Sequence, residues 1–384
     1  MRRRHRWLAL VGMAALVALL VGCAQGGARL PDTSTHARGE GQHAAPCASP
    51  YARNPVFGQV DGNHLLDTGK RVLMPYGVTL YGLARTNWEQ ASADQEWLMK
   101  GAITDWCTNF IRLQLAPAHL LDRAPYDRAY VRAIEAQVAY AASWDQNVIL
   151  SAQTEWDQTG GGGANPTPQT VRFWRVLAPL FKSDPRVWFD LFNEPRLKMG
   201  APSTSWQLWQ DGGTVGGVTY VGMQQLVNTV RASGAPNLIF AEGPQWGESL
   251  AGLAEHRLTG ANIAYAVHSY SAHTQAQWDL RFGDASATVP VLDDEWSQSA
   301  VDKTCSADAG NWVPRFLVYL RQHQIGLGVW GFQPGVMLAS AETFAPTTIP
   351  AGYACQRIGT KGQYHNTEGA GQLVEQYFRT YARD

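Results

Sequence analysis

Short apolar segments recur along the chain and are separated by amphipathic stretches. Four of the intervening stretches carry apolar side chains at the 3.6-residue spacing of a helix that buries one face. Strands that alternate with helices predict a parallel sheet, and nearly continuous apolar strands predict burial on both faces of that sheet. The predicted strands are residues 76–81, 109–113, 147–151, 187–192, 237–241, 263–267, 289–292 and 325–330, and the predicted helices are 127–144, 171–181, 221–232 and 311–323.

The number of repeating units favours a closed barrel. Eight strand–helix units over about 300 residues fit an α/β fold of the (β/α)8 barrel (TIM barrel) type with a single catalytic domain. A doubly wound dinucleotide-binding sheet is the alternative, but no GxGxxG motif follows the first predicted strand. Residues 59–72, with Gly62 and Gly69 as turn residues, predict a hairpin before the barrel. Barrel enzymes carry their functional side chains at the C-terminal ends of the strands, so we sought candidate residues there.

The first 55 residues predict an export signal and a tether. Residues 1–6 are basic, and residues 7–22 form an apolar run that is short for a membrane span and typical of a secretory signal. The sequence before Cys23 resembles the bacterial lipobox, which implies that Cys23 is lipidated and anchors an extracytoplasmic protein to the membrane. Cleavage upstream and a retained anchor are the alternatives. Residues 23–55, rich in small and polar residues, predict a flexible tether, and residues 56–384 the catalytic domain.

Charge and composition exclude several classes of partner. The 384 residues are 45% hydrophobic and 16% charged, with a formal net charge of −1. Without the four arginines of residues 1–22, the mature chain has 27 basic and 32 acidic residues. The chain has no excess of basic residues, so its charge does not indicate a nucleic-acid partner. We expect a monomer that contacts the membrane only through its lipid anchor. The 15 tryptophans indicate either a large core or stacking surfaces for a ligand.

The cysteines after Cys23 indicate disulfide bonds rather than a metal site. An even number of them in an exported chain favours disulfides, and no CxxC pair suggests zinc, so we expect no metal and no cofactor. Three pairings are possible. We favour Cys305–Cys355, which would close a long insertion, and Cys47–Cys107, which would tie the N-terminal segment to the domain.

Two glutamates stand at the ends of predicted strands. Glu194 follows Asn193 after the fourth strand, and Glu295 ends the acidic run after the seventh. A pair of carboxylates in one barrel mouth is what glycoside hydrolysis requires, because one protonates the leaving oxygen while the other attacks or stabilises the sugar carbon.

These residues lie in motifs that resemble a known family. From about residue 60 to about residue 379, the chain resembles the cellulase-type glycoside hydrolases of family 5, within a wider clan of retaining barrel hydrolases. The resemblance implies cofactor-independent cleavage of a β-linked glucan, mannan or related polysaccharide or oligosaccharide by double displacement. The motifs are GVTLYGL (77–83), NFIRLQL (109–115), DLFNEP (190–195), HSY (268–270), VLDDEW (291–296) and VWGFQPG (329–335).

The resemblance implies a role for individual residues. Glu194 would be the general acid/base and Glu295 the nucleophile. Arg112 would hydrogen-bond Glu295 and keep it ionised, because a nearby cation lowers the pKa of a carboxyl group. The implied binding residues are Asn193 at the sugar 2-hydroxyl, His268 near both acids, Tyr270 on the Glu295 carboxylate and Trp330 beneath the sugar.

One position departs from the family pattern. Gln153 stands where the family usually has a histidine, and it can bind a hydroxyl but cannot carry a proton. The two-glutamate mechanism is unaffected, whereas the details of the cleavage subsite are altered. Asp293 and Asp294 are rival carboxylates beside Glu295, but strand alternation predicts that Asp294 points away from Glu295. Glu194 is expected to have mostly aromatic neighbours.

Six tryptophans are predicted to lie in loops after the strands. Flat apolar sugar faces stack on such rings, so Trp156 and Trp246 are candidates for substrate binding. The six are Trp88, Trp156, Trp206, Trp209, Trp246 and Trp296.

Two other functions remain open. A transglycosylase would use the same two glutamates and differ only in its acceptor. A surface-tethered, non-catalytic carbohydrate-binding barrel is supported only by Gln153. The sequence has neither the GxSxG nor the HExxH motif of other hydrolases.

Overall fold

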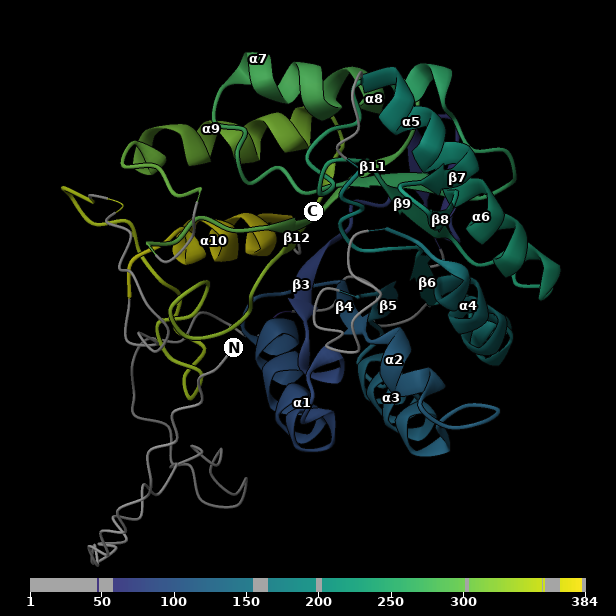
Figure 1. Cartoon of the computed structure of the whole chain (residues 1–384). Coiled ribbons are helices and arrows are strands. Elements are labelled where there is room, and N and C mark those ends of the chain that lie inside the picture. Colours follow the sequence, from purple (N-terminus) through teal and green to yellow (C-terminus); the bar gives the residue numbers. More distant parts are fainter. Residues whose placement is uncertain are drawn as a thin grey trace, which may run out of the picture. The chain divides into compact units, whose positions relative to one another are not determined.

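Eight parallel strands close into a barrel (Figure 1). Strand order follows the sequence, and the last strand of the series pairs with the first, Leu327 lying opposite Tyr76. The predicted (β/α)8 fold is therefore confirmed. The strands are β3 (Tyr76–Leu80), β4 (Phe110–Leu115), β5 (Asn147–Ala152), β6 (Val187–Asp190), β9 (Ile239–Glu242), β10 (Ile263–Val267), β11 (Val291–Trp296) and β12 (Gly326–Val329).

The computed structural model describes residues 47, 58–154, 165–197, 202–300, 304–353, 355 and 367–381. In these ranges no helix is long and apolar enough to cross a membrane.

Helices connect the barrel strands on the outside. They are α1 (Trp88–Thr104), α2 (Pro117–Leu121), α3 (Arg128–Ala142), α4 (Pro168–Phe181), α5 (Pro202–Asp211), α6 (Met223–Ala232), α7 (Gln275–Trp278), α8 (Asp284–Ser286), α9 (Ala309–Gln322) and α10 (Gly371–Tyr381), with the short turns η1 (Gly82–Ala84), η2 (Leu253–Glu255) and η3 (Asp279–Gly283).

The four predicted helices correspond to α3, α4, α6 and α9. Helix α4 begins before residue 171 because Thr167 caps its N-terminus in a capping box and Pro168 fits the first helical position. The sequence pattern missed α1, whose buried face consists mostly of small or polar residues such as Ala91, Gln95 and Gly101.

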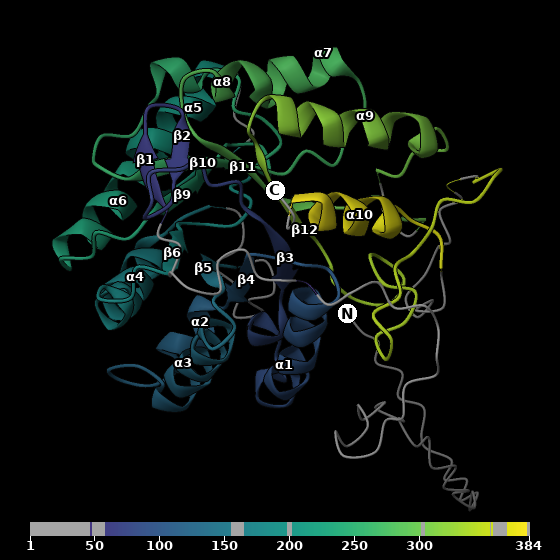
Figure 2. The ribbon, with the colours of Figure 1, turned by 180° about the vertical axis from the view of Figure 1, so that it is seen from behind.

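Two hairpins flank the barrel. The predicted one pairs β1 (Gln59–Asp61) with β2 (His64–Leu66), and Leu65 joins the apolar cluster inside the barrel (Figure 2). The second, β7 (Gly212–Val215) with β8 (Val218–Val221), was not predicted. Its signal was the pair Gly216-Gly217, whose positive φ angles suit the tight turn of a two-residue hairpin.

The barrel interior has an apolar layer below a polar one. Alternate residues of each strand point inward, so Phe110 of β4 lies in the inner apolar cluster and Arg112, two residues later, lies in the polar layer. Besides Phe110, the apolar layer contains Ile149, Trp188, Phe240 and Leu292. The polar layer contains, with Arg112, the residues Ser151, Asp190, Glu242 and Asp294.

Disulfide bonds join Cys47 to Cys107 and Cys305 to Cys355. These are the two pairs that the sequence favours. The Cα–Cα distances of 5.2 and 5.7 Å lie within the ordinary range for disulfides.

The placement of four tryptophans in loops was wrong. Trp88 is the first residue of α1, Trp206 and Trp209 lie in α5, and Trp296 ends β11. Trp206 and Trp209 are buried and donate their indole N–H groups to main-chain carbonyls. Trp296 packs against the ring of Phe316 in α9. Much of the tryptophan excess therefore belongs to the core.

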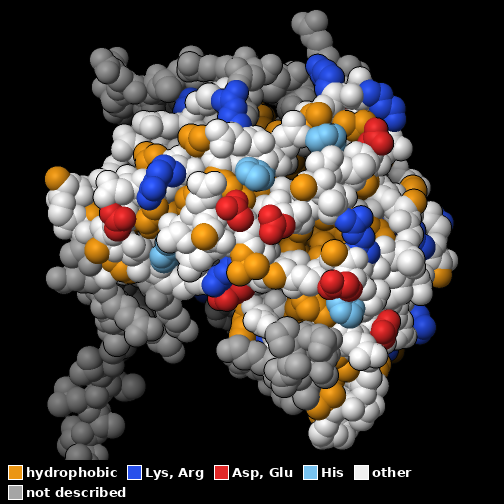
Figure 3. Space-filling view, turned by 90° about the horizontal axis from the view of Figure 1, so that it is seen from above, with side chains coloured by type: hydrophobic (Ala, Val, Ile, Leu, Met, Phe, Trp, Pro, Cys, Tyr) orange, Lys and Arg blue, Asp and Glu red, His pale blue; other side chains and the backbone are white. Residues whose placement is uncertain are grey.

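The outer face over α7 and α9 mixes basic, acidic and hydrophobic side chains (Figure 3). A cavity of about 470 Å³ lies between these helices and is lined by Trp278, Tyr319 and His323, among others. None of its lining residues belongs to the sequence-predicted site.

Asp293 of β11 holds the segment that follows β10. Its buried carboxyl accepts the main-chain N–H of Ser269 at 3.3 Å and also hydrogen-bonds the Ser269 hydroxyl. Burial raises the pKa of Asp293 to about 8. The folded protein therefore keeps a proton on Asp293 at a pH where the unfolded chain releases it.

This difference predicts a pH-dependent stability. The contribution of Asp293 is fully present below its unfolded pKa, near 4, and is lost as the pH rises toward 8. Relative to Asp293→Asn, the wild-type free energy of unfolding should fall by up to about 1.4 kcal/mol per pH unit between about pH 5 and 8. Denaturant unfolding at several pH values measures this slope, with Asp284→Asn, at an exposed position, as the control. Parallel curves for wild type and Asp293→Asn would contradict the prediction.

Candidate active site

Arg112 lies at the centre of the polar layer and is fully buried. Its Nη1 lies 2.9 Å from Glu295 Oε2, and its Nη2 lies 2.7 Å from Asp190 Oδ2 and 2.9 Å from Glu242 Oε1. Its Nε lies 3.1 Å from Asp294 Oδ2. Burial would lower the pKa of Arg112, but the four carboxylates raise it well above its usual value.

The carboxylates of this layer outnumber its cations. Burial is the main cause that raises the pKa of Glu242 well above its usual value and also raises the pKa values of Asp190 and Glu295. For Glu295, the charges of His268 and Arg112 act in the opposite direction. Several carboxyl groups therefore compete for few positive charges, so their ionisation is coupled.

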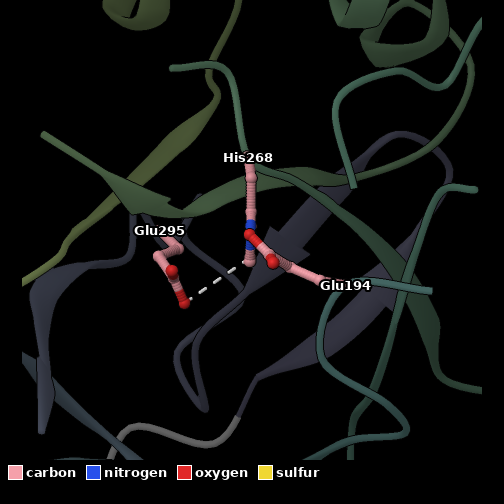
Figure 4. Close-up of side chains that lie close together, drawn as sticks. All are labelled: Glu194, His268 and Glu295. Carbon is pink, nitrogen blue, oxygen red and sulfur yellow. Dashed lines mark hydrogen bonds and ion pairs between the residues drawn. The ribbon is translucent and has the colours of Figure 1, made fainter. Parts of the chain in front are cut away.

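Glu194 and Glu295 both contact the imidazole ring of His268 (Figure 4). His268 Nδ1 lies 3.1 Å from Glu194 Oε1, and His268 Nε2 lies 4.0 Å from Glu295 Oε2. One ligand atom from each of the three side chains lies within 4.8 Å of the other two. The Glu194 side chain is 16% exposed, so one acid of the pair can be reached from solvent.

Four further hydrogen bonds hold the Glu295 carboxylate and Asn193. Tyr270 donates its hydroxyl to Glu295 Oε1 at 3.2 Å, and Gln114 Nε2 donates to Glu295 Oε2 at 2.9 Å. Asn193 Oδ1 accepts from Arg112 at 2.8 Å and from Gln114 at 3.1 Å. The Asn193 amide nitrogen is buried and has no hydrogen-bond partner among the described residues.

The predicted orientation of Asp294 was wrong. Asp294 and Glu295 are adjacent in sequence, yet both contact the guanidinium of Arg112. The pairing of β11 with β12 shifts register between Asp293 and Trp296, which interrupts strand alternation. This β-bulge turns two successive carboxylates toward one cation.

Glu194 makes polar contacts with two residues of the cluster. Besides His268, it contacts Glu242, which accepts the main-chain N–H of Glu194 at 2.6 Å. Glu194 has a φ of 51°, a left-handed conformation that is unusual for a residue with a side chain.

The other predicted binding residues surround this cluster or lie outside the described residues. Trp330 follows β12, is half-buried, and has its ring centroid 6.0 Å from that of Tyr81. Trp246 is half-buried in the loop after β9, where its main-chain N–H donates to the carbonyl of Pro195 at 3.0 Å. Gln153 is buried just after β5. Trp156 and Cys23 lie outside the described residues.

Sequence reasoning missed Gln114, Ser151, Asp190 and Glu242. Each is a polar residue at an inward position near the C-terminal end of a strand that otherwise reads as apolar. A polar residue at an inward position near the end of an otherwise apolar strand could therefore have identified them from the sequence. The missed residues contribute two of the four carboxylates around Arg112.

Two groups of side chains have the donor types of a metal site. They are Glu194, His268 and Glu295, and Glu242, His268 and Asp294. Arg112 contacts Glu242, Asp294 and Glu295, so its charge already opposes theirs and would repel a second cation. The arrangement suits proton transfer and nucleophilic attack better than metal binding.

Comparison with known proteins identifies the family of the chain. The sequence model of "Cellulase (glycosyl hydrolase family 5)" matches residues 69–335. Endoglucanase N of Pectobacterium atrosepticum is 22% identical over 331 residues, covering 84% of this chain and 67% of the relative. Endoglucanase 5 of Pectobacterium carotovorum subsp. carotovorum is also 22% identical, and the match covers 59% of its length.

Solved structures share the fold. A β-glucanase of Saccharophagus degradans in complex with cellotetraose has a TM-score of 0.65 at 19% identity, covering 89% of this chain and 98% of that one. The catalytic domain of an endoglucanase of Thermobifida fusca has a TM-score of 0.61 at 17% identity, covering 88% and 100%. Because the family model matches most of the chain, the protein belongs to glycosyl hydrolase family 5, the cellulase family, and is a glycoside hydrolase.

Proposed function

We propose that the protein is a retaining β-glycanase that hydrolyses a β-linked glucan, with Glu194 as acid/base and Glu295 as nucleophile. The observation that carries this proposal is the spacing of the two carboxylates. Retaining enzymes hold their carboxyl groups about 5–5.5 Å apart, whereas inverting enzymes need roughly 6.5–9.5 Å to admit a water molecule. One oxygen of Glu194 and one of Glu295 lie within 4.8 Å of each other, and this close approach favours the retaining arrangement over one with a water molecule between the carboxyl groups.

The first step forms a glycosyl–enzyme ester. An oxygen of Glu295 attacks the anomeric carbon, the glycosidic C–O bond breaks, and Glu194 gives its proton to the leaving oxygen. Arg112, Gln114 and Tyr270 hold the attacking carboxylate by three hydrogen bonds. These contacts orient Glu295, and the charge of Arg112 favours its ionised, nucleophilic form.

The second step releases the sugar. Glu194, now ionised, takes a proton from water; the water oxygen attacks the anomeric carbon, and the bond to Glu295 breaks. Glu194 must therefore alternate between its two protonation states in each turnover. A sugar acceptor in place of water would give transglycosylation, which is the second reaction open to this site.

The substrate class rests on the relatives. Two are endoglucanases, and one structural neighbour was solved with cellotetraose. We propose that the amide nitrogen of Asn193, which has no hydrogen-bond partner among the described residues, donates to the sugar 2-hydroxyl. We propose Trp330 as the platform at the cleaved bond, and Gln153, Trp156 and Trp246 as further sugar contacts, with mannan as the alternative polymer.

The proposed location follows from the N-terminal sequence. Residues 1–22 would direct export, lipidation of Cys23 would anchor the mature chain, and residues 23–55 would hold the domain away from the membrane. A tethered, monomeric hydrolase would then act on polysaccharide outside the cytoplasm.

Substitution of the nucleophile tests the reaction. Glu295→Gln removes the attacking carboxylate with little change in volume, so the rate of reducing-sugar release from β-glucan should fall roughly a thousandfold or more. Glu248→Gln is the matched control, because the Glu248 side chain is 42% exposed and forms an ion pair with Arg281 at the surface. A panel of β-glucans and mannans identifies the polymer, and NMR of the first product reports its anomeric form. Unchanged activity of Glu295→Gln, or an inverted first product, would refute the mechanism.

The pH profile tests the state of the nucleophile. Burial raises the pKa of Glu295. Activity should therefore rise with pH as Glu295 ionises. Tyr270→Phe removes a hydrogen bond donated to this carboxylate, so the acid limb of kcat/KM should move to higher pH by roughly 0.5–1 unit. Tyr220→Phe in the β7–β8 hairpin should leave the profile unchanged. An acid limb that stays in place in Tyr270→Phe would exclude this hydrogen bond as a determinant of the Glu295 pKa.

A further inference from the structure

Glu242 contacts the proposed acid/base through two independent routes. Its Oε2 accepts the main-chain N–H of Glu194 at 2.6 Å. Its Oε1 lies 3.2 Å from Nε2 of His268, whose Nδ1 lies 3.1 Å from Glu194 Oε1. The side chain of Glu242 is completely buried. One carboxylate therefore reaches both the backbone and, through the imidazole, the carboxyl group of Glu194.

The barrel explains why Glu242 can reach both partners. Strand β9 lies between β6, which leads into Glu194, and β10, which leads into His268. Glu242 is the last residue of β9 and lies opposite Ala266, two residues before His268. A side chain at this position is the natural bridge between the residues that follow the two neighbouring strands.

Glu242 is itself fixed. Its Oε1 also lies 2.9 Å from Nη2 of Arg112, and its main-chain carbonyl accepts the indole N–H of Trp209 at 2.7 Å. Both the backbone and the side chain of Glu242 are therefore held by contacts that do not involve Glu194.

We propose that Glu242 is a positioning residue for the acid/base: it holds Glu194 in its left-handed backbone conformation and keeps His268 as an imidazolium that donates to Glu194 Oε1. The inference rests on the proposed function, which makes Glu194 the acid/base. Nδ1 of His268 hydrogen-bonds Glu194 Oε1 at 3.1 Å, and Nε2 lies 3.2 Å from Glu242 Oε1 and 3.3 Å from Asp294 Oδ1 without hydrogen-bond geometry to either. The two carboxylates beside Nε2 favour the positively charged, doubly protonated ring through their charge. With Oε1 occupied by this donor, the proton that Glu194 exchanges with the leaving group is confined to Oε2.

Several charged groups face His268 from the surrounding strands. Glu242 from β9, Asp294 and Glu295 from β11, and Glu194 after β6 all lie within 4.0 Å of a ring nitrogen. Asp293 and Arg112 lie in the same cluster, and the ring of Tyr270 lies edge-on to the imidazole. Burial would lower the pKa of His268, but these carboxylates raise it well above its usual value, in agreement with a charged ring.

Leaving-group dependence tests the proposal, because acid assistance matters only when the leaving group needs a proton. The test compares kcat/KM of Glu242→Gln on phenyl β-cellobioside, which needs assistance, and on 2,4-dinitrophenyl β-cellobioside, which does not. We expect the loss on the phenyl substrate to be at least tenfold greater than the loss on the dinitrophenyl substrate. A purely structural defect would reduce both values by the same factor.

Two further variants separate the possible failures. Asp190→Asn is the matched control: Asp190 is equally buried and binds Arg112 at 2.7 Å, but within the described part of the chain it makes no hydrogen bond or ion pair with Glu194 or His268. It should reduce both substrates equally. Glu194→Ala should show the largest difference between the substrates. If Glu194→Ala shows this difference and Glu242→Gln does not, the role of Glu242 is refuted. If Glu194→Ala shows no difference, the assignment of the acid/base fails instead.

A measurement on the unsubstituted protein covers the case in which Glu242→Gln does not fold. The ¹⁵N shifts of the His268 ring, assigned by their loss in His268→Gln, report whether each nitrogen carries a proton. We expect both nitrogens to be protonated throughout the pH range of activity. A neutral ring in that range would overturn the proposal.

Discussion

The buried charge of Arg112 is the interaction on which the rest of the site depends. A guanidinium without water is very unfavourable unless carboxylates surround it, and the barrel supplies four of them from β6, β9 and β11. The converse also holds: without Arg112, four carboxylates would face one another in the same small volume. Neither side of this arrangement is stable alone. Burial of these charges is therefore favourable only when the strands are in the register that brings Arg112 and the four carboxylates together.

The apolar layer beneath makes that register available. Phe110, Trp188 and Phe240 fill the barrel two residues before the polar layer on their own strands, so a shift of one residue on β4, β6 or β9 would turn a charge toward the helices outside. The single local departure is the bulge in β11, which brings Asp294 and Glu295 onto the same cation. Glu295, the proposed nucleophile, therefore gains its contact with Arg112 through an irregularity rather than through regular alternation.

The bulge in β11 could not be predicted from the sequence. The barrel, its eight strands and the strand-end glutamates follow from apolar periodicity and from short motifs, because both are local properties of the chain. The bulge depends on how β11 pairs with β12, and no local pattern encodes that pairing. Glu242 was missed for a related reason: the segment IFAE reads as an apolar strand with a polar end, and its partners Glu194 and His268 follow other strands. The tryptophans were misplaced because loop-like spacing does not reveal the packing of α5 or of Trp296 against α9.

The same geometry bears on how two chemically identical residues take different tasks. Glu295 is held by donors on both oxygens: Tyr270 on Oε1, and Gln114 and Arg112 on Oε2. These contacts favour a carboxylate that stays ionised. Among the described residues, Glu194 has a hydrogen-bond contact to one oxygen, through His268, and its side chain is more exposed than that of Glu295, which leaves the other oxygen for a proton exchanged with a ligand. In the mechanism proposed above, neighbouring strands of the barrel would therefore set the difference between acid and nucleophile, since the contact on Glu194 passes through Glu242.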